Sequence, residues 1–398
     1  MFEAINSLPA DPILGLMAAF RADTNAHKID LGVGVYKDER GQTPVMRAVK
    51  QAETRLLANQ QTKTYVAPAG QEEYNHLIAG LIFGNTLRDQ LAGRRVTFQT
   101  PGGCGGLRLG AEFLQKVKPG AKIMVSDPTW ANHIPLLGEA GLNISKYPYY
   151  DYQHHAIRFD AMMDSLSSAG AGDLVLLHGC CHNPCGADLD QQQWQAIAEL
   201  AHKNGFTPFI DLAYQGLGDG IVEDCYGVRL LAETLPELVV VSSCSKNFGL
   251  YRERAGSLTV ISSNASSARA AGSQIASIAR SIYSMPPDHG AAVVIEILGD
   301  SELNADWEIE LTEVRNRING LRTELVNALA AKGLDHDFSF IQREKGMFSF
   351  LGLSVDQVHR LINDYSIYLV DSSRINIAGI NHSNLDYLAD SIKKVLTE

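Results

Sequence analysis

Short apolar runs alternate with helical patterns between about residue 95 and residue 262. Strands that alternate with helices are typical of a mostly parallel sheet covered by helices. The pattern therefore predicts an α/β domain with a central, mostly parallel sheet. The expected strands are Arg95–Thr100, Lys122–Ser126, Asp173–His178, Thr207–Asp211, Leu238–Ser243 and Gly256–Ser262, and helices are expected at Leu107–Val117 and Gln191–Asn204.

A long amphipathic segment follows the alternating region. Its apolar residues recur every three or four positions and form one stripe, which predicts a single helix that Gly333 would end. About 30 helical residues span roughly 45 Å, enough to leave one domain and enter another. The stripe comprises Leu303, Trp307, Leu311, Val314, Ile318, Leu321, Leu325 and Leu329.

The chain is long for one hydrophobic core, with 398 residues, so two domains are expected. The opening segment does not fit the alternating pattern, and we expect it to join the C-terminal part. The predicted division is an N-terminal arm at 1–12, a small α+β domain at 13–40 and 313–398, and a large domain at 41–312.

The charge balance narrows the classes of partner. Lys and Arg total 34 and Asp and Glu total 45, so the net charge is −11. An acidic chain without a basic run argues against nucleic acid or an anionic membrane as the partner. An anionic substrate would therefore have to be bound by a few placed arginines.

The cysteines and the N-terminus indicate a soluble protein of the cytoplasm. Six cysteines show one C-x3-C pair without a histidine cluster, so we expect reduced thiols and no metal site. The N-terminus lacks the features of a signal peptide, and no apolar stretch approaches the roughly 18 residues of a membrane helix. The cysteines are Cys104, Cys180, Cys181, Cys185, Cys225 and Cys244.

Lys246 follows the apolar run Leu238–Ser243, within a segment rich in serine and arginine. Ligands of open α/β sheets bind outside the carboxyl ends of the strands. Partial burial and nearby cations lower the pKa of a lysine there and make its amine a usable nucleophile. A lone lysine in a polar loop is more often a surface residue, but the serines and Arg254 together make an anion site.

Three other segments follow expected strands. Asp211 ends an apolar run and needs a cationic partner such as a protonated pyridine nitrogen, unless it caps the next helix. Asn183 lies in an Asn-Pro turn and can donate a hydrogen bond to a ligand, or the segment is a turn only. The glycines of Pro101–Gly106 would let backbone N–H groups approach a phosphate. They do not match the dinucleotide-binding or P-loop patterns, which argues against a dehydrogenase.

Two motifs together carry a resemblance to a known family. Ser243 to Arg254 reads S-x-S-K-N-F-G-L-Y-x-E-R, and Asp211 to Gly216 reads D-x-A-Y-Q-G. The chain resembles the aspartate and aromatic aminotransferases, which are fold-type I enzymes of pyridoxal 5'-phosphate (PLP). The resemblance runs from Asp11–Leu16 to Ser373–Gly379 and implies a fold-type I PLP-transferase fold.

The resemblance implies a role for each residue around the cofactor. Lys246 would hold PLP covalently and move the substrate proton, and Asp211 would keep the pyridine nitrogen protonated. Tyr214 and Asn183 would hydrogen-bond the phenolic oxygen, while Trp130 would stack on the ring. His133 resembles the histidine that orients the aspartate. The phosphate would be bound by Ser243, Ser245, Arg254, Gly103 and Cys104.

The resemblance also implies a homodimer with shared active sites and a substrate pocket. Tyr65 resembles a tyrosine that reaches the phosphate of the neighbouring subunit. Arg374 matches the arginine that binds the α-carboxylate, and Arg280 matches the partner's arginine for a distal carboxylate. The pocket walls would include Val33, Gly34 and Phe348, besides Trp130, Asn183 and Met285.

Pocket positions give mixed indications of the substrate. Cys104, Met285 and Thr64 stand where aspartate-preferring members usually have Thr, Asn and Asn, whereas Val35, Lys37 and Thr43 follow the aspartate type. A thioether in place of an amide favours an aromatic ring. We therefore expect ping-pong transfer from phenylalanine, tyrosine, tryptophan and aspartate to 2-oxoglutarate. The alternatives are an aspartate aminotransferase in the narrow sense and a non-catalytic binding protein on the same scaffold.

Overall fold

The computed structural model describes residues 2–7 and 12–398, and the chain divides into two compact units. The larger unit is Pro44–Asn316, and the smaller one combines Met1–Thr43 with Arg317–Glu398. The expected long helix is α12 (Ser301–Ala331), which belongs to both units, and Gly333 follows it with a positive φ of 69°. Residues 1 and 8–11 of the expected arm at 1–12 lie outside the described residues.

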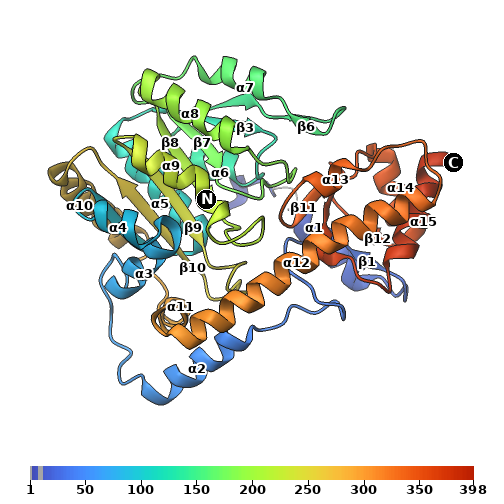
Figure 1. Cartoon of the computed structure of the whole chain (residues 1–398), viewed down its shortest axis with the longest axis horizontal. Helices are drawn as coiled ribbons and strands as arrows, with labels where there is room; N and C mark the ends of the chain where they lie inside the picture. Colours follow the sequence, from blue (N-terminus) through green and yellow to red (C-terminus); the bar gives the residue numbers. More distant parts are fainter. Residues whose placement is uncertain (1, 8–11) are drawn as a thin grey trace. The chain divides into compact units, whose positions relative to one another are not determined.

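A seven-stranded sheet forms the centre of the larger unit (Figure 1). The strand order is β2-β10-β9-β8-β7-β3-β4. Strand β10 runs opposite to the other six strands, which all share one direction. The mostly parallel sheet is therefore confirmed. The strands are β2 (Arg95–Pro101), β3 (Lys122–Asp127), β4 (Asn143–Pro148), β7 (Leu174–His178), β8 (Thr207–Leu212), β9 (Leu238–Ser243) and β10 (Ala255–Ile261).

The pattern of apolar runs identified every strand of this sheet except β4. The reason is that β4 has exposed polar residues at Asn143 and Lys146, which interrupt any apolar run. A strand that is buried on both faces reads as a continuous apolar run, and a partly exposed strand such as β4 does not. The run Val239-Val240-Val241 in β9 is an example of the buried kind.

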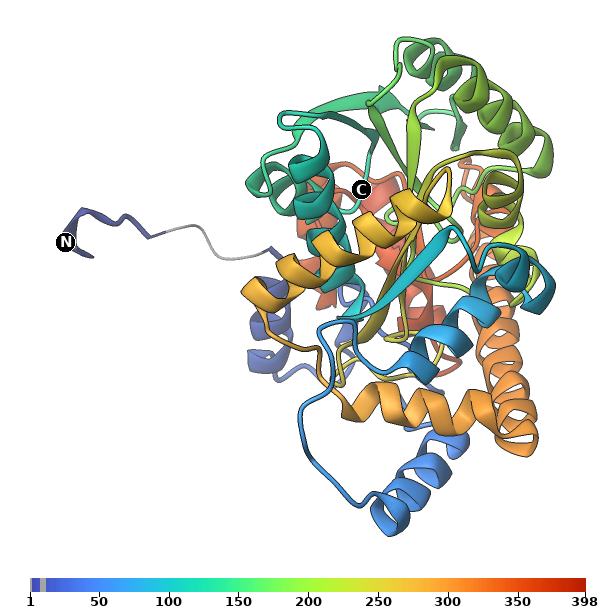
Figure 2. The same cartoon turned by 90° about the vertical axis from the view of Figure 1, so that its left-hand side faces the viewer.

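Helices cover both faces of the sheet (Figure 2). One face packs in a single apolar core with α5 (Gly102–Val117), α6 (His133–Glu139) and α10 (Ala265–Ile282). On the other, α3 (Glu72–Phe83) and α9 (Tyr226–Thr234) contact strands. The unit also contains α2 (Arg47–Asn59), α4 (Asn85–Gln90), α7 (Phe159–Leu166), α8 (Gln191–Asn204), η2 (Glu223–Cys225), α11 (His289–Gly299) and the hairpin β5 (Tyr150–Asp151) and β6 (Ala156–Ile157).

The smaller unit contains two short sheets and several helices. Strand β1 pairs with β12 in parallel, and β11 pairs with β13 in the antiparallel sense. Its elements are η1 (Phe2–Ala4), α1 (Pro12–Ala22), β1 (Ile29–Asp30), the end of α12, α13 (Phe340–Arg343), β11 (Phe348–Phe350), α14 (Val355–Tyr365), β12 (Ile367–Tyr368), β13 (Arg374–Asn376), η3 (Ile377–Gly379) and α15 (Leu385–Thr397).

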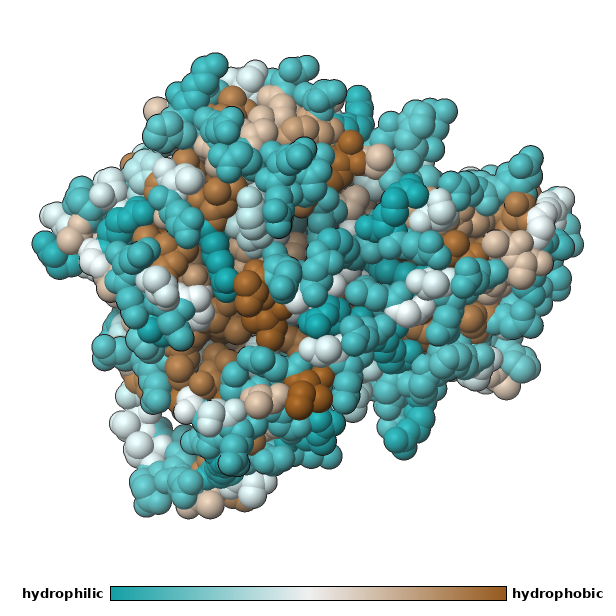
Figure 3. Space-filling view, in the orientation of Figure 1, coloured by the Kyte–Doolittle hydropathy of each residue, from teal (hydrophilic) through white to brown (hydrophobic). Residues whose placement is uncertain are grey.

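The face of the chain shown in Figure 3 is mostly hydrophilic, with smaller apolar patches between the polar side chains. Within the described ranges, no helix combines the length and the apolar character that a membrane span requires.

The parallel strands bring four loops to one edge of the sheet. Strands β3, β7, β8 and β9 all point the same way, so the segments after them leave from neighbouring positions. The register places His178, the last residue of β7, opposite Asp211 in β8. Trp130, Asn183 and Lys246 lie in the loops after β3, β7 and β9, and they therefore all belong to this edge.

Trp307 of α12 anchors the segment that follows Lys246. Its ring is fully buried and stacks on Phe248, with centroids 4.4 Å apart and planes 6° apart. Its indole N–H donates to the Asn247 carbonyl at 2.8 Å. A large buried ring and a satisfied carbonyl thus fix the backbone immediately after the lysine.

The variant Trp307→Phe should lower the free energy of unfolding by about 2 kcal/mol or more. It leaves a cavity and a buried carbonyl without its donor. Urea denaturation checks this, with Ile309→Ala as the control on an exposed position of the same helix, where a change within about 0.5 kcal/mol is expected. Wild-type stability of Trp307→Phe would contradict the anchoring role.

Candidate active site

Lys246 is partly buried in the turn after β9. It lies next to Tyr214, which follows the neighbouring strand β8. Its Nζ atom is 4.6 Å from the centroid of the Tyr214 ring. Burial lowers the pKa of Lys246; the charge of Asp211 opposes this lowering and the charge of Arg254 adds to it. A lowered pKa leaves more of the amine unprotonated, which is the form that attacks a carbonyl carbon.

Asp211 is a buried carboxylate near the end of β8. Its Oδ2 atom accepts a hydrogen bond from Nε2 of His133 at 3.0 Å. Burial alone would raise the pKa of Asp211, but the bond from His133 and the nearby His178 and Lys246 hold the pKa below its usual value. An ionised carboxylate kept in the interior suits a cationic partner, such as a protonated ring nitrogen.

A chain of hydrogen bonds continues from His133 to the neighbouring strand. Because a carboxylate only accepts, the Nε2 atom of His133 carries the proton, and its Nδ1 atom lies 2.8 Å from Thr129 Oγ1. Thr129 also meets Nε2 of His178 at 3.2 Å. Burial, aided by His133, lowers the pKa of His178 to about 3, so that ring is neutral.

Sequence reasoning placed His133 beside Asp211 but missed Thr129 and His178. The one signal for His178 is its register position opposite Asp211, which requires the strand order. Trp130 lies in the same loop, with its ring centroid 5.2 Å from that of His133 in an edge-on arrangement. The indole and the histidine therefore stabilise each other's positions beside the carboxylate.

Arg254 and two serines form a cradle for an anion at the start of α5. Arg254 donates to Ser245 Oγ at 3.3 Å. A Cβ atom on Gly102 would lie 2.5 Å from the Arg254 guanidinium, and one on Gly103 would lie 3.1 Å from the Ser243 side chain. The guanidinium, the hydroxyls and the backbone N–H groups of this first helical turn thus lie together, as in phosphate sites.

Gly256 allows the backbone to close around this cradle. A Cβ atom there would lie 2.5 Å from the Gly102 carbonyl carbon and 2.8 Å from the Gly103 nitrogen. Cys104, also expected at the phosphate, lies in the same turn and is partly exposed. Its sulfur meets the Asn132 amide at 3.6 Å.

The turn after β7 carries Asn183, which is buried. The turn is closed by a hydrogen bond from the Gly186 N–H group to the His182 carbonyl at 2.7 Å. Asn183 leaves the sheet from the strand adjacent to β8, whose end leads to Tyr214. Both residues therefore belong to the same sheet edge as Lys246.

Three expected site residues lie toward the surface of the larger unit. Tyr65 is 88% exposed, and Arg280 is exposed in the last turn of α10. Met285 is partly buried, and its sulfur accepts the Val66 N–H group at 3.4 Å. This contact ties the segment of Tyr65 to the segment that follows α10.

In the smaller unit, Arg374 and Phe348 form a stacked pair. The guanidinium carbon of Arg374 is 4.3 Å from the centroid of the Phe348 ring, and Nη2 donates to the Gly32 carbonyl at 2.7 Å. A Cβ atom on Gly34 would lie 2.6 Å from Phe348 Cζ. The ring thus fills the space that a side chain at position 34 would need, and it supports the arginine.

Two residues that sequence reasoning missed hold this arrangement in place. The amide of Asn376 donates to the carbonyls of Val33 at 2.6 Å and Val35 at 2.8 Å. Buried Arg322 of α12 donates to the Phe348 carbonyl at 2.6 Å. Asn376 follows Arg374 by two residues, so the spacing places both on the same face of β13, which was the available signal.

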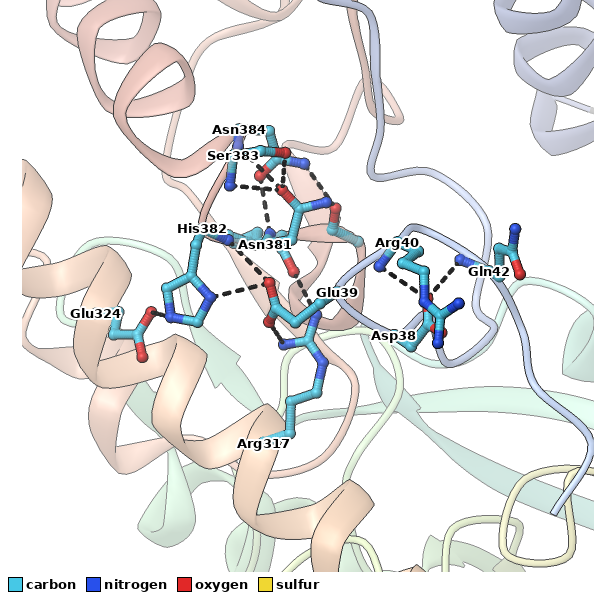
Figure 4. A network of polar contacts seen from close by, with 12 residues as sticks. Asp38, Glu39, Arg40, Gln42, Arg317, Glu324, Asn381, His382, Ser383 and Asn384 are labelled. Carbon is cyan, nitrogen blue, oxygen red and sulfur yellow. Dashed lines mark hydrogen bonds and ion pairs between the residues drawn. The ribbon is translucent and has the colours of Figure 1, made fainter. Parts of the chain in front are cut away.

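Glu39 connects the loop at 38–42 to other segments of the smaller unit (Figure 4). Its carboxylate accepts from Arg317 at 2.8 Å and from His382 Nδ1 at 2.9 Å, and His382 Nε2 lies 3.5 Å from Glu324. Burial tends to raise the pKa of Glu39, but the His382 and Arg317 contacts lower it overall. The loop at 38–42 is thereby joined to α12 and to the C-terminal segment.

Buried thiols and a carboxylate meet near the turn that carries Asn183. One ligand atom each from Cys180, Cys181 and Asp224 lie within 4.8 Å of one another. Both oxygens of Asp224 already accept backbone N–H groups, from Gly216 at 2.8 Å and Asp219 at 2.8 Å among others. The carboxylate therefore serves to close the loop after Tyr214.

The variant His133→Phe should raise the pKa of Asp211. The ring volume is kept, but burial then acts on the carboxylate without the opposing hydrogen bond. A carboxyl whose pKa is lower in the folded than in the unfolded protein stabilises the fold, and this stabilisation is lost as the pH falls through the folded-state pKa. Because that pKa is higher in the variant, the variant should lose the stabilisation at a higher pH than wild type. Carboxyl ¹³C NMR of Asp211 and acid denaturation check this, and an unchanged titration would contradict it.

Comparison with known proteins gives one consistent result. Residues 26–392 match the family model described as aminotransferase class I and II. The chain is 48% identical to an aspartate aminotransferase of Haemophilus influenzae, with 100% of both chains covered. It is 46% identical to an aromatic-amino-acid aminotransferase of Pseudomonas aeruginosa, with 100% of this chain and 99% of the relative covered.

A solved structure agrees with the sequence comparison. The aromatic-amino-acid aminotransferase of Burkholderia pseudomallei, covalently bound to pyridoxal phosphate, superimposes with a TM-score of 0.97 at 43% identity, with 100% of both chains covered. The fold is thus that of the fold-type I enzymes expected from the sequence. The chain belongs to the aminotransferase class I and II family and is itself an aminotransferase.

Proposed function

We propose that this aminotransferase uses PLP to transfer the amino group of aromatic amino acids, and also of aspartate, to 2-oxoglutarate. The observation that carries the proposal is the pairing of Lys246, an amine of lowered pKa, with Asp211, a buried ionised carboxylate, at one edge of the sheet. Relatives of similar identity carry both the aspartate and the aromatic name.

The residues at this edge fit PLP group by group. Lys246 supplies the amine for the covalent link, and Asp211 supplies the negative charge for the pyridine nitrogen. Trp130 supplies a flat apolar face for the ring. The phosphate would be bound by Ser243, Ser245, Arg254 and the first-turn N–H groups of Gly103 and Cys104.

PLP, when bound, supplies an electron sink for cleavage of a bond at the substrate Cα. With PLP in place, the Lys246 amine would take the proton from the substrate Cα and would deliver it to C4′ of the cofactor. The hydrogen bond from His133 keeps the Asp211 carboxylate ionised, so that it would stabilise a protonated ring nitrogen. Tyr214 and Asn183 would donate hydrogen bonds to the phenolic oxygen of PLP and so stabilise its negative charge.

Arginines at two positions would orient the substrate. Arg374, stacked on Phe348, offers a planar guanidinium for two parallel bonds to the α-carboxylate. Val33 and Gly34 would form the adjacent wall. Arg280, supplied by a neighbouring subunit, would bind a distal carboxylate.

Acceptance of aromatic rings is supported by Met285. Its thioether sulfur accepts the N–H group of Val66. A thioether is polarizable and apolar, whereas an asparagine amide at this position would be strongly hydrated. Burying an aromatic ring is worth a few kcal/mol, about 2 or more. Retention of Arg280 keeps the dicarboxylic substrates.

A homodimer in the cytoplasm completes the proposal. Large apolar side chains stay exposed near the residues assigned to the neighbouring subunit, including Leu57, Tyr65 and Ile282, which are 88%, 88% and 48% exposed. Exposed apolar surface of this kind favours association with a second protein chain. Tyr65 would then reach the phosphate of the other subunit.

A substrate panel with purified enzyme tests the function. We expect kcat/KM for phenylalanine and tyrosine within roughly tenfold of that for aspartate, and parallel initial-rate lines when both substrates vary. Lys246→Ala should lose turnover and the covalent cofactor absorbance. Negligible activity on aromatic substrates would indicate the narrow aspartate enzyme, and turnover by Lys246→Ala would contradict the mechanism.

The variant Gly34→Ala should raise KM for the amino acid substrate by roughly tenfold or more, because the new methyl group displaces the Phe348 ring from Arg374. Gly32→Ala is the matched control, since its Cβ would have no neighbour nearer than 3.5 Å. Steady-state kinetics of both variants check this. Equal effects on KM would contradict the role given to Phe348.

A further inference from the structure

The turn that presents Asn183 is closed by a side-chain contact as well as by its backbone. Cys185 is fully buried, and its Sγ atom lies 3.1 Å from Nδ1 of His182. The contact joins residues 182 and 185 and therefore spans Asn183. On the other side, the N–H groups of Cys181 and His182 donate to Asp188 at 2.6 and 2.8 Å.

The imidazole of His182 is held between two aromatic rings. The Tyr149 ring stacks on one face with centroids 4.2 Å apart, and the His178 ring lies 4.0 Å away. Burial lowers the pKa of His182 well below its usual value, and His178 and His133 lower it further. The ring is therefore neutral and carries a single proton.

The Nε2 atom of His182 has a hydrogen-bond partner within the core. It lies 3.0 Å from Oγ of buried Ser126.

Because a hydroxyl accepts as well as donates, Ser126 can accept a hydrogen bond from Nε2, which leaves Nδ1 of His182 as an acceptor. The only hydrogen that the Cys185 contact can supply is that of the thiol. We propose that Cys185 is a positioning residue, whose S–H group donates to His182 Nδ1 and so holds the turn that presents Asn183. Its effect on catalysis rests on the proposed function, in which Asn183 donates to the phenolic oxygen of PLP.

The proposal requires a hydrogen-bond donor at position 185, and side-chain volume alone does not meet this requirement. Two variants of equal size distinguish a donor role from a space-filling role. Cys185→Thr keeps a donor at this position, whereas Cys185→Val has the same shape without one. If Cys185 only fills space, both variants behave alike. A buried acceptor without a donor should disturb the turn in Cys185→Val alone.

The first measurement is long-range ¹⁵N NMR of the histidine-labelled protein. Wild type and Cys185→Thr should show His182 as the Nε2–H tautomer with a hydrogen-bonded Nδ1. Cys185→Val should show a shifted Nδ1 resonance or a changed tautomer. Identical His182 resonances in Thr and Val variants, or an Nδ1–H tautomer in wild type, would overturn the proposal whatever the enzyme's activity.

The second measurement is the pH titration of the cofactor absorbance in the PLP-loaded enzyme. Weaker donation to the phenolic oxygen leaves more negative charge beside the lysine nitrogen, so the midpoint should rise in Cys185→Val. It should stay at the wild-type value in Cys185→Thr, with kcat/KM lowered roughly fivefold only in the Val variant. Equal midpoints in both variants would overturn the link to Asn183, whereas a wild type without this absorbance would overturn the proposed function instead.

Discussion

The site depends on keeping one carboxylate ionised inside the larger unit. Burial of Asp211 works against its charge, and an isolated buried carboxylate would take up a proton. The structure opposes this with a hydrogen bond from His133, which continues through Thr129 to His178 on the adjacent strand. In the proposed function, this charge would stabilise a cationic ring nitrogen at the same place.

The sheet explains why the other groups lie near this carboxylate. Parallel strands end at one edge, so Lys246, Asn183 and Tyr214 leave from neighbouring loops without any special connection. The anion cradle forms where the antiparallel strand β10 begins, since Gly256 lets the backbone approach the start of α5. The smaller unit prepares its arginine separately, through the stack of Arg374 on Phe348.

The sequence predicted those parts of the molecule that depend on local pattern. Buried strands appear as apolar runs, so β9 was predicted with its observed bounds, whereas the edge strand β4 lacks such a run. Lys246 and Asp211 stand directly after or at the end of these runs, which made them visible. The family motifs, and not spacing, assigned their roles.

Other features could not be read from the sequence because they require the order of strands or the direction of side chains. The link from Thr129 to His178 depends on β7 lying beside β8. The contact of Cys185 with His182 depends on how the turn folds back, although both residues stood in the segment that sequence reasoning selected. Asn376 and Arg322 act through carbonyl groups, which leave no trace in residue type.

The most direct test is a crystal structure of the purified protein with PLP. We expect continuous density from Lys246 Nζ to the cofactor, and one Asp211 oxygen within hydrogen-bond distance of the pyridine nitrogen. A cofactor without a covalent link to Lys246, or with its ring nitrogen turned away from Asp211, would contradict the central claim.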